Sequence, residues 1–180
     1  SDINGYTQVT HVVQRTILNN LEQKLNIQPS HVAIDGCSAA APFMRLKDIA
    51  RLYLKLGTSQ KPPYKKIYNA ISNNAHLIGG IKRFDTEFIK AMEGQGISKG
   101  GGEGVIGLFI NTKPYGPIGM SLKIEDGHHR CRDNAVMTVL NYLNLLTPDT
   151  ISKLDHYLNK PILNYNKIQI GHIVSEISKL

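Results

Sequence analysis

The chain has 180 residues, of which 41% are hydrophobic and 19% charged, a composition typical of a globular protein with one core. Its formal net charge is +7, from 21 Lys and Arg residues against 14 Asp and Glu. It contains neither an apolar run of roughly 18 residues nor a secretory signal pattern. Because Cys37 and Cys131 lie far apart in unlike contexts, a disulfide framework is not expected. We therefore expect a cytoplasmic protein with no membrane partner.

Hydrophobic spacing in the first half of the chain predicts four helices and one short strand. The first three, in chain order, are a helix from about Thr10 to Leu25, a strand at 31–35 and a helix from Leu46 to Gly57. A third helix follows the Lys/Pro turn, and its inward-facing residues are expected to be Ile67, Ala70, Ile71 and Leu77. The fourth helix carries Phe84, Phe88, Ile89 and Met92. Asp85 or Thr86 is expected to cap the last of these helices.

The second half changes character at Gly94 to Gly104, a stretch with six glycines and Lys99. Apolar residues at 105–110 and 118–124, separated by a Pro/Gly turn at 114–117, predict an antiparallel hairpin. A helix over 135–146, a second helix with Thr147 as cap and Pro148 in its first turn, and a strand at 166–174 complete the pattern. The sequence thus predicts an α/β (α+β) fold, with an antiparallel sheet flanked by helices in a single domain over 1–180.

A basic chain raises the question of nucleic acid, but here the lysines are scattered. The densest group, Lys61 to Lys66, is interrupted by two prolines and lies beside Tyr64 and Tyr68. Aromatic rings that stack on bases, next to positively charged lysines, would suit single-stranded nucleic acid. A solvated turn leading into a helix is the preferred interpretation, and no nucleic-acid partner is expected.

Nucleotide binding is not expected either. Lys99 follows Ser98 and precedes Gly100, which does not match the P-loop pattern. Residues 102–107 match GxGxxG literally, but the dinucleotide motif follows a strand and opens a helix, whereas this segment leads into a predicted strand.

Lys99 remains as a lysine bordered by glycines, whose missing side chains leave room for a ligand or another backbone. Lysine can act as a base or as a proton relay to a serine when its neutral form is favoured. A flexible loop with a solvated lysine explains the residues equally well, and Glu103 is either a charge partner of Lys99 or an exposed acid.

The run Asp35-Gly36-Cys37-Ser38 is the second candidate, because a strand that ends in Asp-Gly presents polar side chains at a sheet edge. A cysteine nucleophile needs a histidine base, and the sequence positions none near Cys37. A metal site needs several ligands, and Cys37 supplies only one. Taken by itself it is better explained as a buried, inert cysteine. His128 and His129 follow two acids, but adjacent histidines at a helix start are expected to point in different directions, which disfavours a metal site.

Four collinear segments resemble the asparaginase II family, whose fold is similar to that of serine β-lactamases. They are 34–46 with its Asp-Gly-Cys element, Arg83-Phe84-Asp85-Thr86, Ser98-Lys99-Gly100-Gly101-Gly102-Glu103-Gly104-Val105, and 118–127 with its following helix. The resemblance covers nearly the whole chain and implies half of a serine β-lactamase-like fold, matching the C-terminal part of the enzyme.

The resemblance implies hydrolysis of L-asparagine or a similar small amide. It assigns Lys99 the role of the catalytic lysine of the β-lactamase Lys-Thr-Gly strand, and Asp35 that of a carboxylate that orients the substrate, with Gly100 and Gly101 beside the substrate. Cys37 matches a cysteine that joins a zinc site in at least some members. No cofactor is required, and zinc is the candidate metal.

The chain departs from the family in lacking an S-x-x-K motif, which would supply the nucleophile, and the C-S-G-K-H segment. We therefore expect a fragment that begins within the family's sequence and is completed by an N-terminal half or by a homo-oligomer. The alternative is an inactive remnant or an amino-acid-binding module that has lost the nucleophile.

Overall fold

The computed structural model of the chain describes residues 3–178 and divides it into two compact units, Ser1–Ile49 and Ala50–Leu180. The fold is of the α+β class with antiparallel sheets and flanking helices, which confirms the predicted fold class. The prediction of a single domain and that of a β-lactamase-like half both stay predictions.

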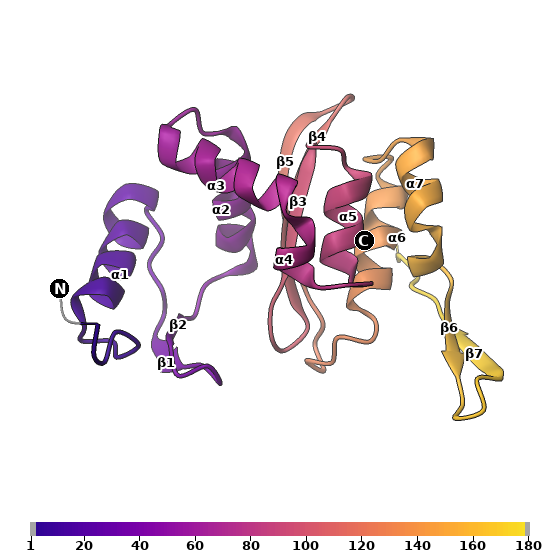
Figure 1. The fold of residues 1–180 in the computed structure, drawn as a ribbon, viewed down its shortest axis with the longest axis horizontal. Coiled ribbons are helices and arrows are strands. Elements are labelled where there is room, and N and C mark those ends of the chain that lie inside the picture. The colour runs from indigo at the N-terminus through magenta and orange to yellow at the C-terminus, as the bar shows by residue number, and fades with distance from the viewer. Residues whose placement is uncertain (1–2, 179–180) are drawn as a thin grey trace. The chain divides into compact units, whose positions relative to one another are not determined.

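The helices and strands follow in this order: α1 Val12–Leu25, β1 Val32–Ile34, β2 Ala40–Pro42, α2 Leu46–Thr58, α3 Pro62–Asn73, α4 Ala75–Gly79, α5 Phe84–Ala91, β3 Gly96–Gly100, β4 Val105–Thr112, β5 Gly116–Lys123, α6 Arg132–Tyr142, α7 Pro148–Leu154, the 3-10 turn η1 Asp155–Tyr157, β6 Lys160–Leu163 and β7 Gln169–Ile173 (Figure 1).

The first unit contains α1 and the β1–β2 hairpin. His11 caps α1 by accepting a hydrogen bond from the Val13 amide at its Nδ1 atom, 3.2 Å away, and Asn26 ends the helix with a φ of 50°. The unit buries few apolar side chains among its described residues, chiefly Leu21 and Ile27. Since apolar burial supplies most of the folding free energy, this unit has little core of its own.

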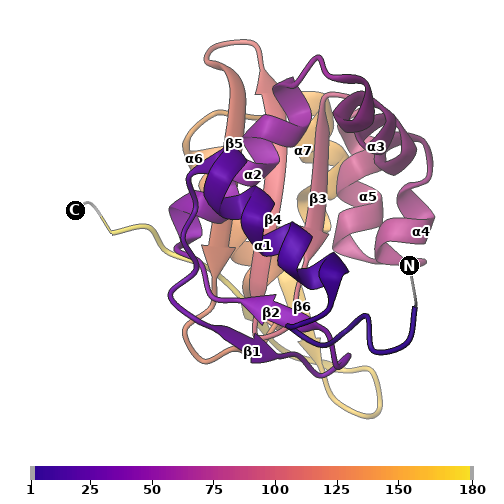
Figure 2. The same ribbon diagram turned by 90° about the vertical axis from the view of Figure 1, so that its left-hand side faces the viewer.

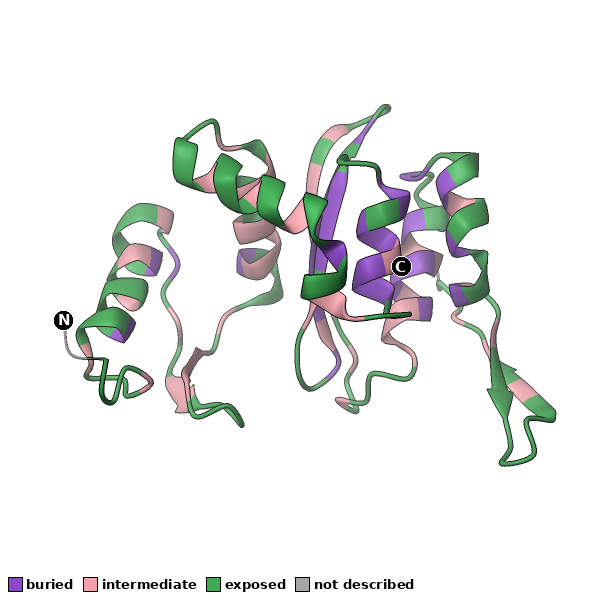
Figure 3. Ribbon diagram, viewed as in Figure 1, coloured by how far each residue is buried: buried purple, intermediate pink, exposed green. Residues whose placement is uncertain are grey.

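The second unit is organised around an antiparallel sheet in the order β3-β4-β5. Figure 1 shows α2 and α3 on one side of this sheet and α5, α6 and α7 on the other. Most of the buried residues of the chain lie in the sheet and in α5 to α7 (Figure 3). The larger core is made by the apolar residues of β4 and β5 that face these helices, including Ile106, Leu108 and Ile110.

Glycines on the other face of the sheet let α2 approach it closely. A Cβ atom at Gly107 would lie 2.1 Å from the Tyr53 ring, and one at Gly119 would lie 2.1 Å from the Ala50 carbonyl oxygen. Figure 2 shows α2 lying across β4 and β5. Only residues without a side chain can be accommodated at these two strand positions.

Several elements differ from the sequence prediction. The strands β2 and β3 were not predicted, and two other segments differ in extent or pairing. The helix expected to turn Leu77 inward ends at Asn73, because Asn74 adopts non-helical angles, and Leu77 on the separate α4 is 73% exposed. The strand expected at 166–174 is shorter and pairs with β6, which periodicity did not reveal because β6 contains Pro161 and lies largely exposed. Thr147 caps α7 as predicted, accepting a hydrogen bond from the Thr150 amide at 3.2 Å.

Within residues 3–178, no helix combines the length and the apolar character that crossing a membrane would require.

Replacing Gly119 with alanine tests the close contact between α2 and β5. The new methyl group would collide with the α2 backbone, so we expect Gly119→Ala to lower the free energy of unfolding by about 1–3 kcal/mol in urea denaturation. Gly102→Ala is the matched control, since a Cβ at Gly102 meets nothing within 4 Å. Equal stability of the two variants would show that α2 does not lie against Gly119.

Candidate functional site

Lys99 lies on the edge strand β3, opposite Gly107 of β4, which places it on the sheet face that α2 covers. The side chain is exposed, and among residues 3–178 its ammonium group donates a hydrogen bond to the Gly100 carbonyl at 3.1 Å and forms no ion pair. Of the two alternatives for Glu103, a charge partner of Lys99 or an exposed acid, the structure has the exposed acid. The ammonium group of Lys123 donates a hydrogen bond to the Glu103 backbone carbonyl. The Lys99 ammonium is thus free to reach a ligand.

The carboxylate of Asp85 binds the residue on each side of Lys99, the side chain of Ser98 and the backbone of Gly100. Asp85 Oδ1 accepts a hydrogen bond from the Ser98 hydroxyl at 2.8 Å, and Oδ2 accepts one from the Gly100 amide at 2.9 Å. Asp85 and Ser98 are both buried, at 5% and 1% exposure. Because each oxygen has a donor, the buried charge is compensated by hydrogen bonds that are stronger than neutral ones. This contact holds β3 in one position at Lys99.

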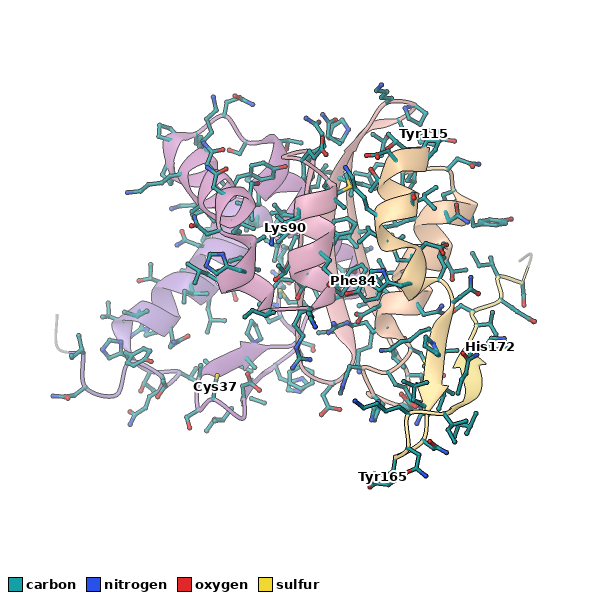
Figure 4. The ribbon with its side chains drawn as sticks, turned by 45° about the vertical axis from the view of Figure 1, so that its right-hand side comes forward. Cys37, Phe84, Lys90, Tyr115, Tyr165 and His172 are labelled. Carbon is teal, nitrogen blue, oxygen red and sulfur yellow. The ribbon has the colours of Figure 1, made fainter. Side chains whose placement is uncertain are left out.

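Asp85 and Thr86 therefore do not cap α5 as the sequence predicted. Arg83 is the N-cap residue, without a side-chain cap, and Thr86 donates to the carbonyls of Ala75 and Gly80 instead. The prediction was wrong because the residue pattern places an acid in the first helical turn but does not reveal the distant strand that the acid contacts. Phe84 of α5, labelled in Figure 4, stacks on Phe88 of the same helix and packs edge-on against Tyr157 of η1.

Tyr53 lies on α2 with its ring against Gly107, and with Lys99 it lines an apolar hollow of about 250 Å³. Burial and, to a smaller extent, the negative charge of Asp85 raise the pKa of Tyr53 to about 12. The hydroxyl is therefore a neutral donor at physiological pH. Tyr53 does not stand out in the sequence, because its spacing is that of an ordinary core residue of a helix.

The two glycines after Lys99 have different neighbours. A Cβ atom at Gly100 would lie 2.3 Å from Nη1 of Arg132, so this position must be glycine for the arginine to lie there. Gly101 donates its amide to the Val105 carbonyl at 2.9 Å. Both backbone amides thus already donate hydrogen bonds within the protein. The predicted position of these glycines beside a substrate stays a prediction, in which they would leave room for the substrate and would not donate hydrogen bonds to it.

Asp35 and Cys37 lie together in the turn between β1 and β2, in the first unit (Figure 4). Asp35 accepts a hydrogen bond from the Gly36 amide at 2.7 Å and another from the Cys37 thiol at 3.4 Å. Cys37 is exposed, so it is not the buried cysteine that its isolated position suggested. A carboxylate has about four acceptor positions, which leaves room on Asp35 for a ligand amine.

The residues at Cys37 do not by themselves fit zinc. One thiol and one carboxylate are present, whereas protein zinc sites use three or four protein ligands. No group of three or more His, Cys, Asp or Glu residues that could hold a metal is found between residues 3 and 178. Zinc at Cys37 therefore stays a prediction that needs ligands from elsewhere.

His128 and His129 lie in the turn before α6, and their rings stack at 4.8 Å with an angle of 12° between planes. The expectation that they point in different directions was wrong, because they precede the helix and do not follow its rotation. Tyr68, considered above for base stacking, donates its hydroxyl to Gly94 and packs edge-on against Phe109. Its ring is therefore engaged in the fold.

A comparison with known protein families shows which family the chain belongs to. The family model described as L-asparaginase II matches residues 1–175. The chain belongs to the L-asparaginase II family. This confirms the resemblance found in the sequence, and it supports an asparaginase-like function with an amide such as that of asparagine as substrate. A comparison with curated proteins finds no significant match.

Replacing Asp85 with asparagine tests the contact on both sides of Lys99 in this L-asparaginase II family member. The amide retains only one good acceptor, so one of the two donors loses its partner. We expect Asp85→Asn to lower the free energy of unfolding by about 1–3 kcal/mol and to speed hydrogen exchange at the Gly100 amide. The control is Asp149→Asn on α7, whose exposed ion pair with Lys153 contributes little. A Gly100 amide that exchanges at the wild-type rate would contradict the contact.

The raised pKa of Tyr53 predicts the behaviour of the second unit at high pH. The unfolded chain ionises this tyrosine near pH 10, whereas the folded chain keeps it protonated to about pH 12. The contribution of Tyr53 to stability is therefore complete below pH 10 and is lost between about pH 10 and 12. Absorbance titration of wild type against Tyr53→Phe should show one tyrosine with a midpoint near pH 12 in the wild type. In Asp85→Asn that midpoint should fall, and a midpoint of pH 10 in the wild type would contradict the burial.

Proposed function

We propose that the chain forms part of an L-asparaginase site that hydrolyses the side-chain amide of L-asparagine to L-aspartate and ammonia. The observation that carries the proposal is Lys99 on an edge strand, with the residues before and after it held by Asp85. The resemblance assigns Lys99 to the family's Lys-Gly-Gly element, and the match to the family model over residues 1–175 supports this assignment.

In the proposed reaction a serine hydroxyl attacks the carboxamide carbon of asparagine, and the C–N bond breaks as the leaving nitrogen takes up a proton. Water then hydrolyses the resulting acyl-serine ester, releasing aspartate and regenerating the hydroxyl. Lys99 is proposed to relay protons to and from the serine and the leaving nitrogen. Asp35 is proposed to hold the substrate's α-amino group. No step is assigned to a metal.

The serine itself comes from outside these 180 residues in this proposal, since none of their serines is followed by lysine three positions later. The first unit supports an association with the part that carries it. Along α1, Val12, Val13 and Ile17 are between 41% and 58% exposed, and Ile34 at the end of β1 is 76% exposed. An apolar surface of this kind is typical of an interface.

A second candidate function is an amino-acid-binding module without turnover. It is favoured by one observation, the absence of S-x-x-K from the sequence. Binding of L-asparagine without release of ammonia, by the chain alone and together with the segment encoded upstream of it, would establish this alternative.

Replacing Lys99 with methionine tests the proposed function. The chain, co-expressed with the segment encoded upstream of it, is assayed for ammonia released from L-asparagine. Because Lys99→Met keeps an unbranched side chain of nearly the same length but cannot move a proton, we expect kcat to fall by about 10²–10⁴-fold. Lys113→Met, in the exposed turn between β4 and β5, should keep wild-type activity.

The proposal fails if neither the chain nor the co-expressed pair releases ammonia. It also fails if folded Lys99→Met turns over asparagine as fast as the wild type does.

A further inference from the structure

A cavity of about 670 Å³ lies in the second unit beside Lys99 and Gly100. It is bordered by the first residues of α5, α6 and β6, so three elements that are distant in sequence meet there. Its volume is within the range of small-molecule binding sites, about 300–1,000 Å³. The proposed function uses the lysine at its edge and leaves the rest of the cavity unassigned.

The three carboxylates that line the cavity are all occupied by partners inside the protein. Asp85 binds Ser98 and Gly100 as described above. Glu87 Oε2 accepts the Tyr157 hydroxyl at 2.9 Å and lies 2.8 Å from His156 Nε2. The third, Asp133, pairs with the arginine that precedes it. The acids therefore do not neutralise the other cations of the cavity.

Arg132 is the cation that the structure fixes most firmly. Its Nε and Nη2 atoms lie 2.9 and 2.8 Å from Asp133 Oδ1, and its side chain is only 14% exposed. Nη1 of Arg132 occupies the space that a side chain at residue 100 would take, which is open because that residue is glycine. No acceptor for Nη1 is found among the described residues, so this end of a guanidinium group already held in place can donate to a ligand. Held arginines suit planar carboxylates.

Further positive charge surrounds Arg132. Lys82, Arg83 and Lys160 line the same cavity, and no ion pair is found for any of them within residues 3–178. Helices α5 and α6 also begin here, and neither has a side-chain cap hydrogen bond, so their amide ends add partial positive charge. The cavity thus has an excess of positive charge.

We propose that this cavity binds the carboxylate group of a small molecule, with Arg132 as its anchor and Lys82, Arg83 and Lys160 as the surrounding charge. In the context of the proposed function, on which only the choice of amino acid rests, the carboxylate is that of the substrate or product. The ligand then reaches from Arg132 toward Lys99, and the cavity selects amino acids with a free carboxylate over neutral amides.

The test is a calorimetric binding titration of the full chain. It measures binding alone and does not depend on the release of ammonia. L-aspartate is the probe, inorganic phosphate is the general anion, and L-asparaginamide is the matched ligand without a carboxylate. We expect saturable binding of L-aspartate that weakens with added salt, partial competition by phosphate, and no binding of asparaginamide.

Arg132→Gln removes the anchor and is expected to weaken aspartate binding by about tenfold or more. Because Arg132 packs over Gly100, its replacement also removes a packing contact. The double variant Lys82→Ala/Arg83→Ala on the exposed rim is therefore a second test, and we expect it to weaken aspartate binding as well. The control is Lys65→Ala/Lys66→Ala on the exposed face of α3, which should bind as wild type does.

Wild-type aspartate affinity in both the folded Arg132→Gln variant and the rim variant would overturn the proposal. So would equal binding of asparaginamide, or binding of phosphate without aspartate. Aspartate binding in a protein that releases no ammonia would contradict only the proposed asparaginase function and leave this inference standing.

Discussion

The arrangement around Lys99 depends on the hydrogen bonds of one buried carboxylate. Asp85 lies in the first turn of α5 and accepts from Ser98 and from Gly100, so a single side chain connects the helix to the strand before and after the lysine. An unpaired carboxylate at this depth would be costly, which means that strand and helix must meet for either to be stable there. The same contact places Gly100 beneath Arg132 and so connects the lysine to the charged cavity.

The sheet carries these contacts because its two faces differ. One face of β4 and β5 is apolar and packs against α5, α6 and α7, which supplies the larger core. The other face has glycines where α2 crosses, so that the Tyr53 ring lies close to the strand carrying Gly107, opposite Lys99. Lys99 therefore stands between an apolar hollow and a basic cavity, a setting in which a polar ligand could be oriented from both ends.

Features that depend on near neighbours in sequence were predictable. The periodicity of α1 and α2, the hairpin of β4 and β5 and the Thr147 cap were all correctly predicted, because spacing and capping are local properties. Features made by distant residues were not. Asp85 was expected to cap its own helix, because its partner Ser98 lies 13 residues away. Arg132 was not singled out, because Gly100, against which it packs, lies on a strand distant in sequence. Lys99 was assigned by family resemblance, and its exposed position on β3 leaves its catalytic role to experiment.

The central claim is that Asp85 positions Lys99 for catalysis, and steady-state kinetics of folded Asp85→Asn with L-asparagine test it most directly. The measurement uses the chain together with the serine-bearing part that the proposed function requires. If the claim holds, kcat falls by about tenfold or more while KM changes little, because the lysine is displaced and the anchor for the substrate carboxylate at Arg132 remains. A wild-type kcat in folded Asp85→Asn, or a loss confined to KM, would contradict it.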